Sequence, residues 1–195
     1  WRGRTVVRAI VYLPIMFSTI VIGILFTYIL HSDGLVNTAL TKVGLGVLAK
    51  DWLGDFGLAL YSVVGIDTWM GVGWTVVLVL AALQAIPNDV IEAARLDGAE
   101  GWQLTFRIKM PFIAHAVNLA LLLTFISGMK VFDIVFASTG GGPGNSTEVL
   151  ATYLQKSMSS GSLGFPAAVS VVQFVLITIL AFIINRIARR TEARA

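Results

Sequence analysis

The sequence predicts an all-α membrane protein, a polytopic bundle of helices. Of its 195 residues, 56% are hydrophobic and only 13% are charged, and the mean hydropathy is +0.83. Several nearly continuous apolar runs have the roughly 20 residues that a helix needs to cross a bilayer. Backbone amides cannot stay unpaired in hydrocarbon, so runs of this length must be helical, and the alternation typical of β-barrel strands is absent from the sequence. The net charge of +3 is too small to suggest a nucleic-acid partner.

Four spans are predicted in chain order, at about residues 9–30, 62–86, 112–130 and 163–185. The second is ambiguous, because the apolar stretch from Phe56 to Ile86 is longer than one span requires. It is either one long tilted helix or a short interfacial segment followed by a span that starts near Asp67 or Thr68. We interpret Asp67 as a helix cap near the outer interface rather than a proton carrier. Gln173, in the last span, is expected to form an interhelical hydrogen bond, with a role in a translocation path as the alternative.

Lys and Arg are concentrated on one side of the predicted membrane, and that side is assigned to the cytoplasm. The protein is thereby predicted to be a multi-pass protein of the cell (inner) membrane, with both ends of this chain and residues 88–111 in the cytoplasm, and residues 31–57 and 131–160 outside. The cytoplasmic set is Arg2, Arg4, Arg8, Arg95, Arg107, Lys109, Arg186, Arg189, Arg190 and Arg194, and the outer set is Lys42, Lys50, Lys130 and Lys156.

The polar segment 88–111, NDVIEAARLDGAEGWQLTFRIKMP, lies between two apolar runs and is predicted to form a helix, a break, a short helix and a stop. Asp89 falls in the first turn, where the helix dipole favours a carboxylate, and Gly98 tolerates the positive φ of a sharp turn. Pro111 is expected to close the segment before the third span. Such a helix–turn–helix could seat in a groove of a partner, whereas the alternative for an arbitrary loop is an amphipathic helix in the headgroups.

The residue spacing within this segment favours docking on a partner protein over an amphipathic helix in the headgroups. Glu92-Ala93-Ala94, three residues, Gly98, nine residues, Ile108, one residue and Met110-Pro111 resembles the EAA loop of binding-protein-dependent ABC import permeases. The chain departs from that pattern only at Met110, where the family has Leu, a volume-conserving exchange. The segments VYLPIMFSTIVIGILF, DTWMGVGWTVVLVLAALQAIP and KVFDIVFASTGGGPGNSTEVLATYL are also similar to this family, and the last resembles the F-type (MalF/UgpA-like) partner of carbohydrate importers.

The resemblance implies a type I ABC importer permease fold over residues 1–195, with four spans present of about six, so that N-terminal spans are expected to be missing. It also implies that the EAA loop docks on a separate ATPase and couples ATP hydrolysis in that subunit to movement of this chain. The implied coupling residues are Glu92, Ala93, Ala94, Asp97, Gly98, Ile108 and Pro111. The implied partners are a second permease, two ATPase subunits, an extracytoplasmic sugar-binding protein that touches residues 131–160, a small-molecule sugar and membrane lipid.

No catalytic residue, metal site or cofactor is predicted for this chain. It has no GxxxxGK[ST] motif to cradle phosphates, so ATP and magnesium are assigned to the partner ATPase. Sugar contacts are expected on two stripes at helical spacing, with ordinary helix packing as the alternative. The stripes are Thr68, Gly71 and Trp74, and Thr124, Ser127, Gly128 and Val131. Alternative functions are an importer of the same family for glycerol phosphate or a polyol, and an ion-coupled secondary transporter.

Overall fold

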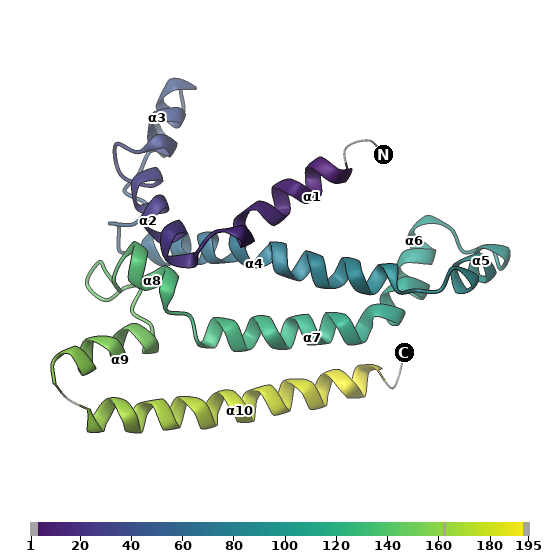
Figure 1. Ribbon diagram of the computed structural model, residues 1–195. Helices are drawn as coiled ribbons and strands as arrows, with labels where there is room; N and C mark the ends of the chain where they lie inside the picture. The colour runs from purple at the N-terminus through teal and green to yellow at the C-terminus, as the bar shows by residue number, and fades with distance from the viewer. Residues whose placement is uncertain (1–3, 162, 193–195) are drawn as a thin grey trace. The chain divides into compact units, whose positions relative to one another are not determined.

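The computed structural model describes residues 4–161 and 163–192, and every regular element in these ranges is a helix. Arg2 and Arg194, which the sequence assigns to the cytoplasmic side, lie outside the described residues. The chain divides into two compact units, one comprising the chain up to Gly73 with Lys130–Val172, the other Trp74–Met129 with the chain from Gln173 onward. The prediction of an all-helical protein is therefore confirmed over the described residues (Figure 1).

Within the described ranges, three helices are long and apolar enough to cross a membrane. These are α4 (Ala59–Gln84), the continuous helix Gly101–Met129 and the apolar part of α10 (Gly164–Glu192). α4 is a single helix of 26 residues. Of the two alternatives, the structure therefore has the one long helix, and not an interfacial segment followed by a span that starts near Asp67 or Thr68. Asp67 accordingly lies eight residues inside α4, so its interpretation as a helix cap was wrong: the apolar residues before it continue the helix rather than lying in the interface.

The first predicted span is not one helix. α1 (Arg4–Tyr12) leads into a short 3-10 helix η1 (Leu13–Met16), and α2 (Thr19–Ile29) follows at a bend of 103°. Pro14 cannot donate a backbone hydrogen bond, and Phe17 and Ser18 adopt extended backbone angles, so the helical ladder is interrupted between the two parts. The two parts pass together as one candidate span, so the described residues hold up to four spans if this bent pair is counted as one. The bend itself was not predicted, because hydropathy records the apolar composition of the run and not its backbone path.

The core of the first unit lies where α2, α4 and α8 (Asp133–Ser138) meet (Figure 1). Its buried side chains are Ile22, Val63, Ile66, Ile134 and Val135. α2 packs closely on α8 because Gly23 has no side chain: a Cβ at this position would lie only 2.7 Å from the Ala137 Cβ. The shorter helices of this unit are α3 (Leu35–Lys42), η2 (Gly46–Leu48) and α9 (Leu150–Ser159).

In the second unit, α5 (Asn88–Leu96) and α6 (Gly101–Gln103) connect α4 with the next span (Figure 1). α6 continues through the π-helix η3 (Leu104–Lys109) directly into α7 (Met110–Met129). Pro111 lies in this helix rather than ending the segment, so the predicted stop was wrong. The Met110 N–H donates to the Thr105 carbonyl five residues back, and this wider turn accommodates the proline that follows. Between α10 and α7, the Gln173 Nε2 donates to the Met129 carbonyl at 3.0 Å, which confirms the predicted interhelical bond.

Candidate coupling site

α5 is the first arm of the 88–111 segment. It begins after Pro87, whose φ is preset near the helical value, and it carries Asp89 in its first turn and Arg95 in its last. Both charges oppose the partial charges of the helix ends and so stabilise a helix of only nine residues. Glu92 and Ala93 are exposed, whereas Ala94 is buried. The arm therefore presents one face outward and packs the other within the unit.

The turn after α5 depends on Gly98. Its N–H donates to the Arg95 carbonyl at 3.0 Å and the next N–H, of Ala99, donates to the Ala94 carbonyl at 2.9 Å. These two bonds form a Schellman motif, which satisfies carbonyls that the helix end would leave unpaired. Gly98 has φ +82, in the left-handed region, and no atom lies within 4 Å of a Cβ built on it. The predicted positive-φ turn is confirmed, and within this chain glycine is required there by backbone conformation rather than by lack of space.

The second arm, α6 with η3, folds back on the first. α5 contacts η3, and Ala94 and Leu104 are the buried side chains of these two elements. Trp102 and Phe106 pack against each other with ring centroids 4.0 Å apart and ring planes tilted by 36°. Trp102 nevertheless remains 76% exposed, and Leu96, the last residue of α5, is 89% exposed. Leu96 and Trp102 are thus two large, exposed apolar side chains, one on each side of the turn.

The predicted coupling residues separate into two groups. Glu92, Ala93, Asp97, Gly98 and Pro111 are exposed, whereas Ala94 is buried and Ile108 is half-buried. The exposed residues of α5 and of the turn are accessible to a partner, and their role in contact stays a prediction. Leu96 was not singled out from the sequence as a contact residue. Its signal was an apolar residue immediately before the turn of an otherwise polar segment.

The residues predicted to contact sugar lie on two long helices. Thr68, Gly71 and Trp74 are exposed along α4, and Thr124, Ser127 and Gly128 are exposed along α7. α7 ends at Met129, so Val131, the fourth member of the second stripe, lies beyond the helix. The lining of a translocation path by these two stripes stays a prediction.

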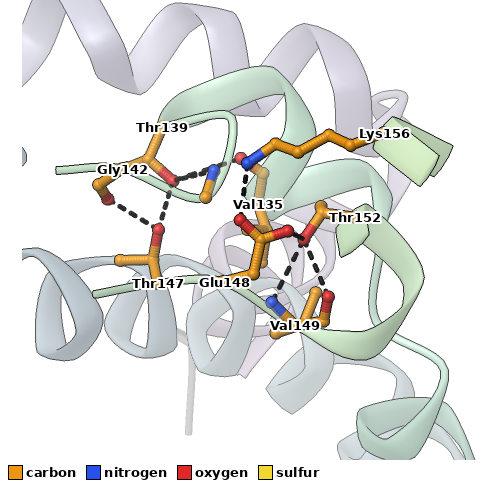
Figure 2. A network of polar contacts seen from close by, with 9 residues as sticks. Val135, Thr139, Gly142, Thr147, Glu148, Val149, Thr152 and Lys156 are labelled. Atoms are coloured by element: carbon orange, nitrogen blue, oxygen red, sulfur yellow. Dashed lines mark hydrogen bonds and ion pairs between the residues drawn. The ribbon is translucent and has the colours of Figure 1, made fainter. Parts of the chain in front are cut away.

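The 131–160 segment is held by two polar networks in the first unit (Figure 2). In one, the buried Thr147 joins the Gly142 carbonyl and the Thr139 hydroxyl, both at 2.7 Å from its Oγ1. In the other, the Glu148 carboxylate accepts from Thr152 Oγ1 at 3.0 Å and pairs with Lys156. Gly141, between the networks, has φ +93, and a Cβ there would collide with the Glu148 carboxylate. The glycine-rich stretch is therefore a closed turn.

Comparison with known proteins identifies the family of this chain. Residues 1–193 match the family described as binding-protein-dependent transport system inner membrane component. The chain belongs to this family of inner membrane components.

Curated members of the family include the probable ABC transporter permease protein YurN of Bacillus subtilis, 36% identical over 87% of this chain. The trehalose/maltose transport system permease protein MalF of Thermococcus litoralis is 34% identical over 96% of the chain. The fold is similar to that in the crystal structure of a bacterial alginate ABC transporter in complex with alginate pentasaccharide-bound periplasmic protein. The TM-score is 0.85 and the sequence identity is 23%, and the match covers 98% of this chain and 67% of that chain. This likeness confirms the predicted ABC importer permease fold.

The chain spans 59% of the length of the Bacillus subtilis family member and 63% of that of the Thermococcus litoralis one. Its match to the family extends nearly from end to end. The activity and partners of the full-length protein therefore do not follow from this match alone.

Proposed function

We propose that this chain is the membrane-spanning permease subunit of an ATP-driven ABC importer, and that it forms part of the translocation path for a sugar delivered by an extracytoplasmic binding protein. Family membership and the names of relatives, among them a trehalose/maltose transport system permease protein, support this proposal. The observation that carries the coupling role is the exposed helix–turn–helix of residues 88–111, with its Schellman turn at Gly98. The implied assembly adds a second permease and two cytoplasmic ATPases.

The coupling segment has the features of a docking element. Glu92 offers an exposed carboxylate to polar or basic groups of the ATPase, and Leu96 and Trp102 offer apolar anchors of the kind that dominate the energy of protein interfaces. When ATP closes the two ATPases, the segment moves with them. Because the second arm runs unbroken into α7, that motion reaches a membrane span directly and can shift the equilibrium between inward-open and outward-open states.

The coupling role is tested by comparing the replacement of one exposed carboxylate inside the EAA pattern with the replacement of another outside it. In cells that express the full-length permease with its partners, Glu92→Gln is expected to lower sugar uptake about tenfold or more, because a charge-assisted hydrogen bond contributes about 1.5–3 kcal/mol. Glu100→Gln removes another exposed carboxylate, one outside the EAA pattern, and is the matched control. Membrane insertion is measured in parallel and should be equal in both variants.

Two outcomes would show that the chain is not an ABC permease subunit. They are uptake that continues after the ATPase is removed, and uptake that continues when residues 92–98 are scrambled. In the first case an ion-coupled carrier becomes the better candidate, with Asp67 inside α4 as the residue to replace. The solute class is tested by a thermal-shift screen of the cognate binding protein against sugars, glycerol phosphate and polyols. Stabilisation by the last two alone would contradict sugar transport.

A further inference from the structure

A cavity of about 500 Å³ lies within the first unit, beside the first half of α4. This volume is in the range of sites that hold small molecules, roughly 300–1,000 Å³. Its wall is almost entirely apolar and rich in aromatic rings. The aromatic and small residues of the wall include Phe26, Trp52, Tyr61, Ser62, Gly65 and Trp69.

The cavity faces away from two of the three predicted sugar contacts on α4. Ser62, Gly65 and Trp69 line it at spacings of three and four residues, which place them on one face of the helix. Gly71 and Trp74 point nearly half a turn away from this face, since each residue advances the helix by about 100°. The cavity is therefore separate from the part of the proposed translocation path that these two residues mark.

Two hydrogen bonds fix part of the wall in place, and they use the polar groups of Ser62 and Trp52. The Ser62 hydroxyl donates to the Trp52 carbonyl at 2.7 Å, and the Trp52 indole N–H donates to Asn37 Oδ1 at 2.8 Å. Asn37 is buried, and Phe26 and Trp69 pack edge to face with ring centroids 5.6 Å apart. A ligand entering this cavity would meet a preformed apolar surface with few hydrogen-bonding groups to spare.

We propose that this cavity binds an acyl chain of a membrane phospholipid. A sugar would bury hydroxyl groups against the bonded Ser62 and Trp52 and leave them unpaired, whereas an acyl chain needs only apolar contact. α4 is a candidate membrane span, and the cavity lies on the face turned away from Gly71 and Trp74, which under this proposal is the side that faces lipid. Tyr61 lines the cavity yet is 74% exposed, which suits an amphipathic ring at the level of the headgroups.

Gly65 allows the cavity to be filled without disturbing the helix. No atom lies within 4 Å of a Cβ built at this position, so the side chain of Gly65→Phe can occupy the space of the acyl chain. Val64→Phe, at the adjacent position on α4, adds a ring outside the cavity lining and is the matched control, because Val64 is already 53% exposed. Thermal unfolding of both variants confirms that each is folded.

The experiment uses the full-length permease assembled with its partners in detergent, with phosphatidylglycerol added in steps and bound lipid counted by native mass spectrometry. The unmodified protein and Val64→Phe are expected to retain one more tightly bound phosphatidylglycerol per permease than Gly65→Phe. The Gly65→Phe variant should need at least about tenfold more lipid for the same occupancy. Equal retention by all three proteins would overturn the proposal.

A second arm replaces the lipid by maltotriose. Saturable maltotriose binding that Gly65→Phe abolishes and Val64→Phe preserves would overturn the lipid assignment in favour of a sugar subsite. Retention of no tightly bound lipid by the unmodified protein would also overturn it, because the cavity would then be covered by another part of the assembly.

Discussion

Substitution of Gly98 tests whether the coupling turn depends on backbone conformation. Its φ of +82 lies in the left-handed region, where residues with a Cβ are disfavoured by about 1–2 kcal/mol. Gly98→Ala should therefore lower the ratio of native to alternative turn conformations about 5- to 30-fold. Asn tolerates this region better and should cost less, whereas a β-branched Val should cost more. The expected order of sugar uptake is Gly, Asn, Ala, Val.

The assay is the initial rate of labelled sugar uptake, normalised to the amount of permease in the membrane. Gly44 supplies the matched control, because it has φ +80, no atom within 4 Å of a built Cβ, and the same pair of turn bonds at the end of α3. Gly44→Ala carries the same backbone cost outside the coupling segment and should leave uptake per inserted molecule unchanged.

An order set by size would refute the reasoning. If Gly98→Ala transports normally while Gly98→Asn and Gly98→Val both fail, the requirement is for space against a partner, and the left-handed backbone is not what limits the turn. Equal losses from Gly98→Ala and Gly44→Ala would instead mean that uptake reports general stability.

Three further substitutions test packing and buried polar contacts. Asn37→Ala should lower stability by about 1–3 kcal/mol, because the Lys50 N–H and the half-buried Trp52 indole N–H lose their acceptor, with the exposed Thr38→Ala as control in thermal unfolding. Gly23→Val should cost about 1–3 kcal/mol by overpacking against Ala137, which is measured as a lower denaturation midpoint; an unchanged midpoint would mean that α2 and α8 separate freely. Thr147→Val removes two bonds at constant volume and should speed proteolytic cleavage of the turn after α8, whereas an unchanged rate would show that these bonds do not hold it closed.

Features that depend on a few adjacent residues were accessible from the sequence. The turn at Gly98 is one, since a glycine after a short run of helix formers is the local requirement of a Schellman motif. The long apolar runs are another, because span length follows from bilayer thickness and needs no knowledge of neighbouring helices. For the same reason the fold class could be inferred from the amino-acid sequence alone, whereas the coupling role of residues 88–111 stays a prediction.

Features that depend on backbone path or on distant partners were not accessible. The bend at Phe17 and Ser18 lies inside an unbroken apolar run, where hydropathy has no signal and Pro14 is the only local indication. Asp67 looked like a cap because a carboxylate before Thr and Trp resembles a helix start. Pro111 looked like a stop because a π turn upstream of a proline cannot be seen in composition. The bond between Thr139 and Thr147 forms only when a glycine-rich turn closes, and no periodicity marks it.

The two ends of the coupling segment are attached to the membrane spans in different ways. On one side, Ala85, Ile86 and Pro87 form a short non-helical link between α4 and α5. On the other side, the 29 residues of Gly101–Met129 are one helix, a rod roughly 43 Å long at 1.5 Å per residue. Its far end is joined to α10 by the hydrogen bond between Gln173 and Met129. Under the proposed coupling, the non-helical link leaves the segment free to change its angle to α4, whereas the continuous helix passes any displacement of the segment on to α7.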